Sequence, residues 1–404
     1  MNRPVIPRAE FAQRRDAARA AARERGLDGL LAWSMGGSTL DRYANVFYLT
    51  NHYDSGNVFP DTHGLYQGFG MAAVVLPVDG EAILLVNQPD WRTDLVECDD
   101  VRVCRFLYDG VGQALADAGL AHGRVGLVDE ERLPVRAHAA VRAAAPGVEL
   151  VPCDELLMAL RVVKSPAEIE LMRHSSAVSV QMMTAMMEAS VVGATDADVV
   201  AAGFAAGAPH GAHPYDFAMA SGPEDGHLWW SRLPSWNPTR PYELGDIVHP
   251  DIYGAVGGYF YDFVRSCVVG GEPSSDQLGI LEAAIGCIHA GCAAARPGAR
   301  GKDVYAAVRD HLRELGMDHS DTAVHGEATL SEDVLEAAGH GIGAGWERPF
   351  LTPHEEMELV PGMTIAIEQH VSKPGVGTVR YEETVLVTEG APEIMTAGCP
   401  ARWW

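Results

Sequence analysis

Residues 242–266 read YELGDIVHPDIYGAVGGYFYDFVRS, and the architecture of the second half of the chain follows from this segment. It carries two aspartates, Asp251 and Asp262, in two strand-like runs on either side of a glycine-rich turn. If these runs pair as a hairpin, both carboxylates can face the same side of a sheet. Two interpretations are open at this point, an acidic hairpin on a solvated edge or two arms of a metal site.

Further residues that suit a metal site follow later in the chain. His340 lies among glycines in AAGHGIGAG, Glu368 ends the apolar run GMTIAIEQH, and Glu382 lies within GTVRYEETVLVTEG. An acidic side chain inside a strand is costly to bury unless it is paired or metal-bound. Carboxylate oxygens and imidazole nitrogens are common ligands of divalent cations. Together with Asp251 and Asp262 these residues form a predicted set of five ligands.

The bulk composition predicts a soluble globular protein of two domains. The chain has 404 residues, of which 47% are apolar and 21% charged. This length exceeds what a single core usually supports, and the composition argues against disorder. The 30 basic and 55 acidic side chains give a formal net charge of −25. Such a charge repels phosphate backbones and anionic lipid, so we expect neither nucleic acid nor a membrane as a partner.

The cysteines and the start of the chain indicate the cytoplasm. Seven cysteines are scattered without a CxxC pair, which is typical of reduced thiols. The first 26 residues are charged and helical in pattern and lack the apolar segment of a signal peptide. No stretch approaches eighteen uninterrupted apolar residues, so no transmembrane helix is expected.

The first half of the chain, residues 1–160, predicts an α/β domain. GLLAWS (29–34) and RVGLVDE (124–130) are typical of buried strands, and residues 71–86 predict a hairpin around Asp79-Gly80. Alternating strands and helices favour a mostly parallel sheet. Residues 51–70 are polar, aromatic and rich in glycine, and predict a long loop of the kind that often serves function.

A change of pattern near residue 160 predicts the boundary to a second domain, residues 161–404. Ser165, Pro166 and Glu168 have the spacing of a helix N-cap with a capping box, and a long amphipathic helix follows. Strands and two more helices, near 275–295 and 302–316, continue to the end.

Taken together, these motifs resemble the creatinase/aminopeptidase superfamily, whose catalytic domain has the pita-bread fold. The five predicted ligands match the family pattern in the family's order, as do VVKSPAEIELMR, LGDIVHPDIYGAVGGYFYDFVRS, GHGIG and ELVPGMTIAIE. DRYANVFYLTNH resembles an element of the N-terminal domain of the long members, such as Xaa-Pro dipeptidase and creatinase. The resemblance implies an α/β N-terminal domain followed by an α+β pita-bread catalytic domain.

The resemblance also implies chemistry and assembly. Two divalent metal ions, manganese, iron, cobalt or zinc, would share Asp262 and Glu382, with Asp251 and His340 each binding mainly one ion. Glu368 would be a ligand that also takes a proton from the attacking water. Arg265, three residues after Asp262, and Thr384, two after Glu382, are expected to support the ligands. The long members imply a homodimer in which loop 51–70 reaches the neighbouring active site.

Two histidines that contact the substrate in family peptidases are missing from the expected positions. The first falls near Pro234 or Trp230, and His227 lies nearby but early in the motif. The second position, seven residues after His340, is occupied by Glu347. We therefore take His227 and Glu347, with Glu368, as the catalytic candidates. An alternative for Glu347 is a rim carboxylate paired with Arg348.

Aromatic residues gather in the segments that would line the substrate cavity. They favour either ordinary core packing or a cage for an onium or apolar substrate, held in part by cation–π attraction. His249, two residues before Asp251, would point the same way and is either a substrate-binding or ligand candidate or an ordinary strand histidine. The tryptophans concerned are Trp229, Trp230, Trp236 and Trp346.

The predicted function is a cytoplasmic metal-dependent hydrolase. It would attack the C–N bond of a small amide-like or amino-acid-derived substrate, as Xaa-Pro dipeptidases and creatinase do. One alternative is a metal-dependent lyase acting on an onium compound such as dimethylsulfoniopropionate, which the missing histidines favour. A second alternative is a non-catalytic binding protein on the same fold, which the retention of all five ligands opposes.

Overall fold

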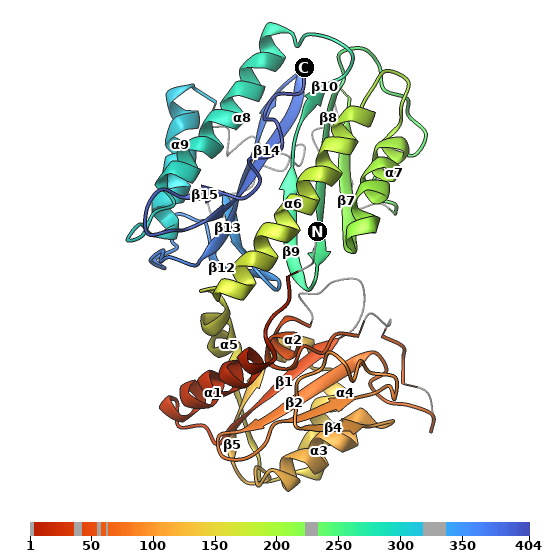
Figure 1. Cartoon of the computed structure of the whole chain (residues 1–404), viewed down its shortest axis with the longest axis vertical. Helices are drawn as coiled ribbons and strands as arrows, with labels where there is room; N and C mark the ends of the chain where they lie inside the picture. Colours follow the sequence, from red (N-terminus) through yellow and green to blue (C-terminus); the bar gives the residue numbers. More distant parts are fainter. Residues whose placement is uncertain (1–3, 36–42, 55–57, 62–63, 223–232, 318–336) are drawn as a thin grey trace. The chain divides into compact units, whose positions relative to one another are not determined.

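A computed structural model describes residues 4–35, 43–54, 58–61, 64–222, 233–317 and 337–404. The chain divides into two compact units, Ile6–Arg161 and a second unit formed mainly by Val162–Trp404 (Figure 1). Each unit has its own sheets and helices, and each is described by itself below.

The first unit is built on one six-stranded sheet with the order β4-β3-β2-β1-β5-β6. The strands β1–β5, β5–β6 and β3–β4 pair in parallel, whereas β1–β2 and β2–β3 are antiparallel. Three of the five strand pairs are thus parallel, and the two antiparallel pairs arise because the predicted hairpin around Asp79-Gly80 pairs directly with β1. The strands are β1 (Gly29–Met35), β2 (Met71–Pro77), β3 (Ile83–Val86), β4 (Asp100–Val103), β5 (Arg124–Val128) and β6 (Glu149–Pro152).

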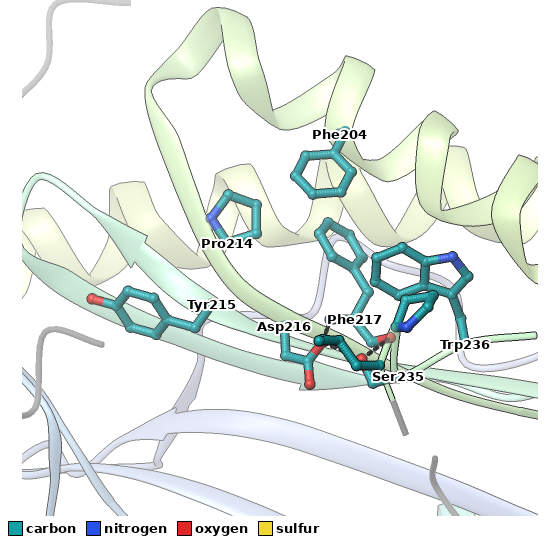
Figure 2. A pocket seen from close by; sticks show the side chains of 9 residues that line it. Phe204, Pro214, Tyr215, Asp216, Phe217, Ser235 and Trp236 are labelled. Carbon is teal, nitrogen blue, oxygen red and sulfur yellow. Dashed lines mark hydrogen bonds between the residues drawn. The ribbon is translucent and has the colours of Figure 1, made fainter. Parts of the chain in front are cut away.

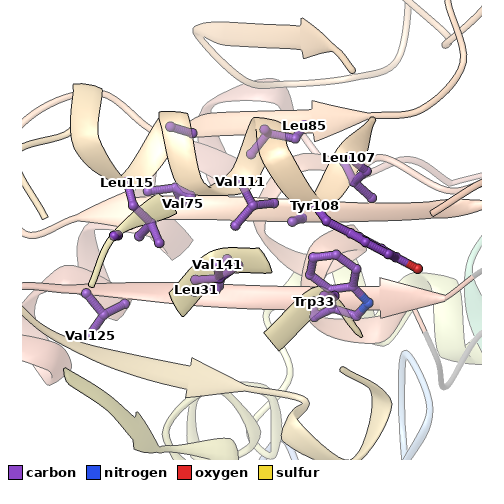
Figure 3. Close-up of a cluster of buried hydrophobic side chains, with 14 of the residues drawn as sticks. Leu31, Trp33, Val75, Leu85, Leu107, Tyr108, Val111, Leu115, Val125 and Val141 are labelled. Atoms are coloured by element: carbon purple, nitrogen blue, oxygen red, sulfur yellow. The ribbon is translucent and has the colours of Figure 1, made fainter. Parts of the chain in front are cut away.

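Helices cover this sheet and close its core. On one face Leu31 and Trp33 of β1 pack with Val111 of α3 and Val141 of α4 in a cluster of fully buried side chains (Figure 3). Because side chains alternate along β1, Leu30 and every second residue from it point to the other face of the sheet, where α1, α2 and α5 pack. The helices are α1 (Arg8–Glu24), α2 (Ala44–Thr50), α3 (Leu107–Asp117), α4 (Val135–Ala144) and α5 (Asp154–Arg161).

The second unit contains two sheets with helices on their outer sides (Figure 1). In one sheet β8 pairs with β7, β9 and β10, and in the other the order is β12-β11-β13-β14-β15. Strands β8 and β9 pack against β14, so the two sheets meet where the predicted ligands lie. The strands are β7 (Ala212–Ser221), β8 (Ile247–Val256), β9 (Tyr259–Val264), β10 (Cys267–Val268), β11 (Gly339–Ile342), β12 (Trp346–Phe350), β13 (Thr364–Lys373), β14 (Gly377–Leu386) and β15 (Glu393–Ile394).

Four helices cover these sheets in the described part of the second unit. The predicted capping box is present: the Ser165 side chain accepts from the Glu168 backbone, and the Glu168 side chain accepts from the Ser165 backbone. Helices α6 and α7 pack on the sheet that contains β7, β8 and β9. Helices α8 and α9 pack together, and α8 covers β13 and β14 of the other sheet. They are α6 (Pro166–Ala189), α7 (Asp196–Gly207), α8 (Ser275–Ala294) and α9 (Gly301–Glu314).

Helix α8 is long and apolar enough to cross a membrane when length and composition alone are considered. Half of its most apolar stretch is buried inside the protein, where the helix packs on β13 and β14. This burial accounts for its apolar composition, since a helix that covers a sheet needs a wide apolar face.

Candidate metal centre

The β8–β9 hairpin brings Asp251 and Asp262 to one face of a sheet. Gly257 and Gly258 form its two-residue turn with φ of 67° and 88°, a conformation that glycine adopts without steric cost. This turn sets the register, in which Tyr253 lies directly opposite Asp262. Asp251 lies two residues before Tyr253 and therefore shares its face. The local sequence thus explains why both carboxylates point the same way.

The second sheet supplies the other three predicted ligands. Glu368 of β13 and Glu382 of β14 lie directly opposite each other, and His340 of β11 lies opposite Ala366 of β13. Close approach of β11 to β13 requires Gly339, because a Cβ atom there would lie 2.0 Å from the carbonyl oxygen of Ala366. Like charges directly across a strand pair are destabilising, so the Glu368–Glu382 pair is itself a sign of a compensating cation.

The ligand atoms of these strands converge. Oxygens of Asp251, Asp262 and Glu382 lie within 4.8 Å of one another, and all three residues are buried. The Nε2 atom of His340 lies 3.4 Å from an Asp262 oxygen and 4.0 Å from a Glu368 oxygen. The other ring nitrogen, Nδ1, is 3.0 Å from the carbonyl oxygen of Gly341. That contact suits an Nδ1–H donor, which leaves Nε2 available as a ligand.

The electrostatics of this cluster are unfavourable in the absence of a cation. Burial and then the neighbouring carboxylates raise the pKa of Glu382. Burial likewise raises the pKa of Asp251, against the opposing effect of Arg380. Burial alone would lower the pKa of His340, but the hydrogen bond and charge of Asp262 outweigh it and raise the pKa to about 8. Burial thus favours the protonated forms of Asp251 and Glu382, and a bound cation would favour their charged forms instead.

The residues present fit divalent metal ions. One oxygen of Asp251 and both oxygens of Glu382 are buried without a hydrogen-bond partner among the described residues. Unpaired buried carboxylate oxygens are costly, and coordination to a cation satisfies them. Four carboxylates with one imidazole form the mixed oxygen and nitrogen donor set that manganese, iron, cobalt and zinc accept.

Arg380 belongs to this site, although the sequence analysis did not single it out. Its Nη1 atom donates to Asp251 at 2.5 Å, and Nη2 lies 3.7 Å from Glu368. Arg380 lies two residues before Glu382, and this period of two along β14 was a signal that could have found it. His370 of β13 lies directly opposite Arg380, so basic groups border the carboxylates on this side.

Trp346 contacts one predicted ligand directly, and His249 lies near Arg380. The indole N–H of Trp346 donates to Asp262 at 3.0 Å, and its ring stands edge-on to His340 at 5.8 Å between centroids. His249 is buried on β8, and burial and then Arg380 lower its pKa to about 3. Neither ring nitrogen of this neutral imidazole has a hydrogen-bond partner among the described residues. Trp346 thus forms part of the wall of the centre, and His249 lies near Arg380.

Glu347 pairs with a residue other than the predicted Arg348. It is buried and accepts a hydrogen bond from the Lys164 Nζ atom at 2.7 Å. Because side chains alternate along β12, Glu347 points away from the face on which Trp346 contacts Asp262. Arg348 pairs with Glu355 at 2.6 Å, so the predicted rim pair of Glu347 with Arg348 is wrong.

The two supporting residues occupy buried positions next to the ligands. Arg265 donates to the backbone oxygen of Glu382 and pairs with Glu383 at 2.7 Å, so it contacts β14. Thr384 lies on β14 opposite Ala366, and its backbone N–H donates to the Thr396 hydroxyl at 3.0 Å. The remaining candidates, His227, Trp229 and Trp230, lie outside the described residues.

Comparison with known proteins gives the same architecture. Residues 170–389 match metallopeptidase family M24, and residues 14–163 match the creatinase/prolidase N-terminal domain. The fold resembles the prolidase of Pyrococcus horikoshii with a TM-score of 0.76 at 20% identity, over 95% of this chain and 98% of that one. It resembles the dipeptidase PepE of Mycobacterium ulcerans with a TM-score of 0.74 at 25% identity, over 96% of both chains.

Similar proteins include peptidases and a creatinase. The probable dipeptidase PepE of Mycobacterium tuberculosis is 32% identical over 305 residues, which are 74% of this chain and 75% of that protein. The creatinase of a Bacillus species is 26% identical over 317 residues, covering 76% and 72% of the two chains. The chain, which also carries a creatinase/prolidase N-terminal domain, therefore belongs to metallopeptidase family M24 and is a metal-dependent hydrolase.

Proposed function

We propose that this hydrolase uses two divalent metal ions to cleave the C–N bond of a small, amino-acid-derived amide, Xaa-Pro dipeptides included. The observation that carries the proposal is the set of buried, unpartnered oxygens on Asp251 and Glu382 beside Asp262 and His340. The names of the relatives, dipeptidase and Xaa-Pro dipeptidase, support the substrate class.

The chain's own residues divide the work of hydrolysis. Bound divalent ions would supply Lewis-acid activation of water and of the scissile carbonyl. Glu368 is the proton acceptor in this proposal, because its side chain is 27% exposed whereas those of Asp251 and Asp262 are 7% and 11% exposed. Arg380, 3.7 Å from Glu368, is placed to orient that carboxylate or to bind an anionic group of the substrate.

The test is detection of released proline by mass spectrometry. Purified protein is loaded with Mn²⁺, Fe²⁺, Co²⁺ or Zn²⁺ and incubated with a panel of Xaa-Pro dipeptides. We expect metal-dependent proline release that Asp262→Ala abolishes. Glu368→Gln should keep most bound metal, measured by elemental analysis, yet lose at least about a hundredfold in kcat, within the range that general acid–base catalysis contributes. Absence of proline from every dipeptide would refute the dipeptidase proposal.

A lyase acting on an onium compound remains the second candidate, because aromatic rings border the predicted ligands. Trp346 lies 5.9 Å from the ring of Tyr253 and contacts Asp262 directly. Aromatic faces attract onium cations. Elimination from dimethylsulfoniopropionate in the same panel, without proline release, would favour this second function.

Three further properties belong to the proposal. We propose manganese, iron, cobalt or zinc as the metal, a homodimer as the assembly and the cytoplasm as the location. All seven cysteines are free, which supports a reducing compartment. Sedimentation analysis tests the dimer, and a monomer with full activity would exclude a role for loop 51–70 at a neighbouring active site.

A further inference from the structure

Within the described residues, the carboxylate of Asp216 on the edge strand β7 accepts hydrogen bonds only from neutral groups. One of its oxygens accepts from the Ser235 hydroxyl and from the Phe217 backbone N–H at 2.8 Å. The other accepts from the Tyr253 hydroxyl at 3.3 Å. Among the described residues no lysine, arginine or histidine pairs with it. These donors hold the carboxylate in place without neutralising its charge.

The register of the sheet places Asp216 in one row with the metal centre. Asp216 of β7 lies opposite Tyr253 of β8, and Tyr253 lies opposite Asp262 of β9. A register shift between Pro214 and Asp216 interrupts β7 at this point, and such irregularities redirect side chains. The Tyr253 ring lies 5.9 Å from the Trp346 ring, which contacts Asp262. From the predicted ligand Asp262 the row therefore leads through Tyr253 to Asp216, and Trp346 contacts both Asp262 and the Tyr253 ring.

Asp216 also lines a pocket of about 270 Å³ at the edge of the same sheet (Figure 2). Figure 2 shows the rings of Phe204, Phe217 and Trp236 around the pocket and Asp216 beside Ser235. Apart from Asp216 and Ser235 the walls are apolar or aromatic.

Phe217, the next residue along β7, packs with Phe204 of α7 on the opposite face of the sheet, so these rings do not border the row that leads from Asp216 to the metal centre. On the face of Asp216 itself, the rings of Tyr253 and Trp346 lie between it and the ligands, and a carboxylate beside aromatic rings suits a group that has an apolar body and a positive charge.

We propose that Asp216 binds a positively charged group of the substrate, an ammonium, amidinium or guanidinium, whose apolar part lies against the rings of Tyr253 and Trp346. This inference deepens the proposed function and relies on it for the bond that is cleaved. In a dipeptide the group is the side chain of the first residue, so lysyl-proline and arginyl-proline are preferred over their uncharged isostere norleucyl-proline. Asp216 is therefore a specificity-determining residue.

The first test compares kcat/KM for these three dipeptides, which all carry the same α-ammonium and proline. We expect the wild type to favour the two cationic substrates at least tenfold. Asp216→Asn should reduce kcat/KM for lysyl-proline about tenfold or more and leave norleucyl-proline within about twofold, while Asp216→Glu restores part of the preference. The matched control is Asp310→Asn, an exposed aspartate paired with Arg313 on α9, which should alter neither. An unchanged preference in Asp216→Asn would overturn the proposal.

A second test does not depend on turnover. The binding of n-butylammonium, n-butylguanidinium and n-butanol to purified metal-loaded protein is measured by NMR titration. We expect the two cations to bind the wild type, and Asp216→Asn to weaken them at least tenfold without changing n-butanol. Equal affinity of n-butylammonium for both proteins refutes the cation site. If no dipeptide is cleaved but the cations bind through Asp216, the dipeptidase proposal is refuted and the proposed cation-binding site is confirmed.

Discussion

At the scale of single residues, a group needed to bind metal lowers the stability of the metal-free protein. Glu382 is 1% exposed, has no hydrogen-bond partner for either oxygen among the described residues, and lies opposite Glu368. A buried charge without a partner destabilises the folded state unless it is protonated or coordinated. Removing that charge should therefore have opposite effects on the metal-free and metal-loaded proteins.

The first prediction concerns Glu382→Gln. In the presence of a chelator near neutral pH, the variant should raise the free energy of unfolding by about 1–3 kcal/mol, because glutamine is neutral in this buried site without taking up a proton. With metal, the same variant should lose about 10–100-fold or more in metal affinity and in activity. Urea unfolding and metal titration measure the two effects. The control is Glu188→Gln on the exposed surface of α6, and a loss of stability by Glu382→Gln in chelator would contradict the prediction.

The second prediction is the pH dependence of the metal-free protein. The raised pKa values of Asp251 and Glu382 mean that the folded state retains protons that the unfolded chain releases. The stability they provide is complete below the ordinary carboxyl range near pH 4 and is lost as pH rises through the folded values. His340 acts in the same direction, with its contribution lost between about pH 6.5 and its folded pKa of about 8.

Thermal unfolding in chelator should therefore give a higher Tm at pH 6 than at pH 8.5. The difference between these two values should shrink in Glu382→Gln, because one of the groups that binds the extra protons is gone. An identical pH dependence in the wild type and the variant would show that the stability change arises elsewhere.

Residue types and spacing revealed part of the site, and contacts between distant strands determined the rest. Asp251, Asp262, Glu368 and Glu382 could be chosen from the sequence because an acid inside an apolar run needs an explanation. The partner of Glu347 could not, because Lys164 lies 183 positions away and only the packed fold brings them together. Asp216 gave no signal either, since its place in the row depends on the register shift in β7.

At the scale of elements, the β11–β12 hairpin carries two neighbouring functions on opposite faces. One face presents His340 and Trp346 to the carboxylates, and the other buries Glu347 against Lys164. Both members of this ion pair are at most 2% exposed in their side chains. The ion pair therefore connects the β11–β12 hairpin to the segment before α6. Because His340 is part of this hairpin, the ion pair also helps to fix the position of His340.

The third prediction separates a structural role of Glu347 from the catalytic role considered at first. Lys164→Met should destabilise the protein by about 3–5 kcal/mol, because it removes the ammonium group that lies 2.7 Å from the buried Glu347 carboxylate. The double variant Lys164→Met, Glu347→Met should recover most of that loss, since it removes both charges. Urea unfolding of the three proteins measures the coupling.

Activity of the double variant completes this test. If Glu347 acts only through the ion pair, the double variant should keep kcat within about tenfold of the wild type under conditions where it is folded. A loss of several orders of magnitude in kcat, with stability restored, would support Glu347 as a general base. Thermal unfolding of the same samples confirms that the comparison is made between folded proteins.

The prediction of elements succeeded where local signals were strong. The turn at Gly257-Gly258, the capping box at Ser165 and the hairpin at Asp79-Gly80 each rest on a few adjacent residues. The strand order of the first sheet was less accessible, because β1 pairs both with an antiparallel hairpin and with a parallel strand far along the chain. Alternating elements alone cannot distinguish that mixed order from a parallel one.

At the scale of the whole molecule, all five predicted ligands lie in one of the two compact units. They come from β8, β9, β11, β13 and β14 of the unit Val162–Trp404, and no predicted ligand lies in Ile6–Arg161. A ligand stabilises only the structure that unfolds with its site. Metal binding should therefore raise the free energy of unfolding of the unit Val162–Trp404 and leave that of the unit Ile6–Arg161 unchanged.

The fourth prediction is a regional response to Mn²⁺ in hydrogen exchange. At about a hundredfold excess over the dissociation constant, metal should stabilise the second unit by about 2.7 kcal/mol, which slows the exchange of globally protected amides about a hundredfold. Peptides from β8, β9, β13 and β14 should show this slowing, whereas those from β1, β2 and β5 should not. Asp262→Ala serves as the control and should remove the response. Equal slowing in both units would mean that they unfold together, and the metal centre would then stabilise the entire chain.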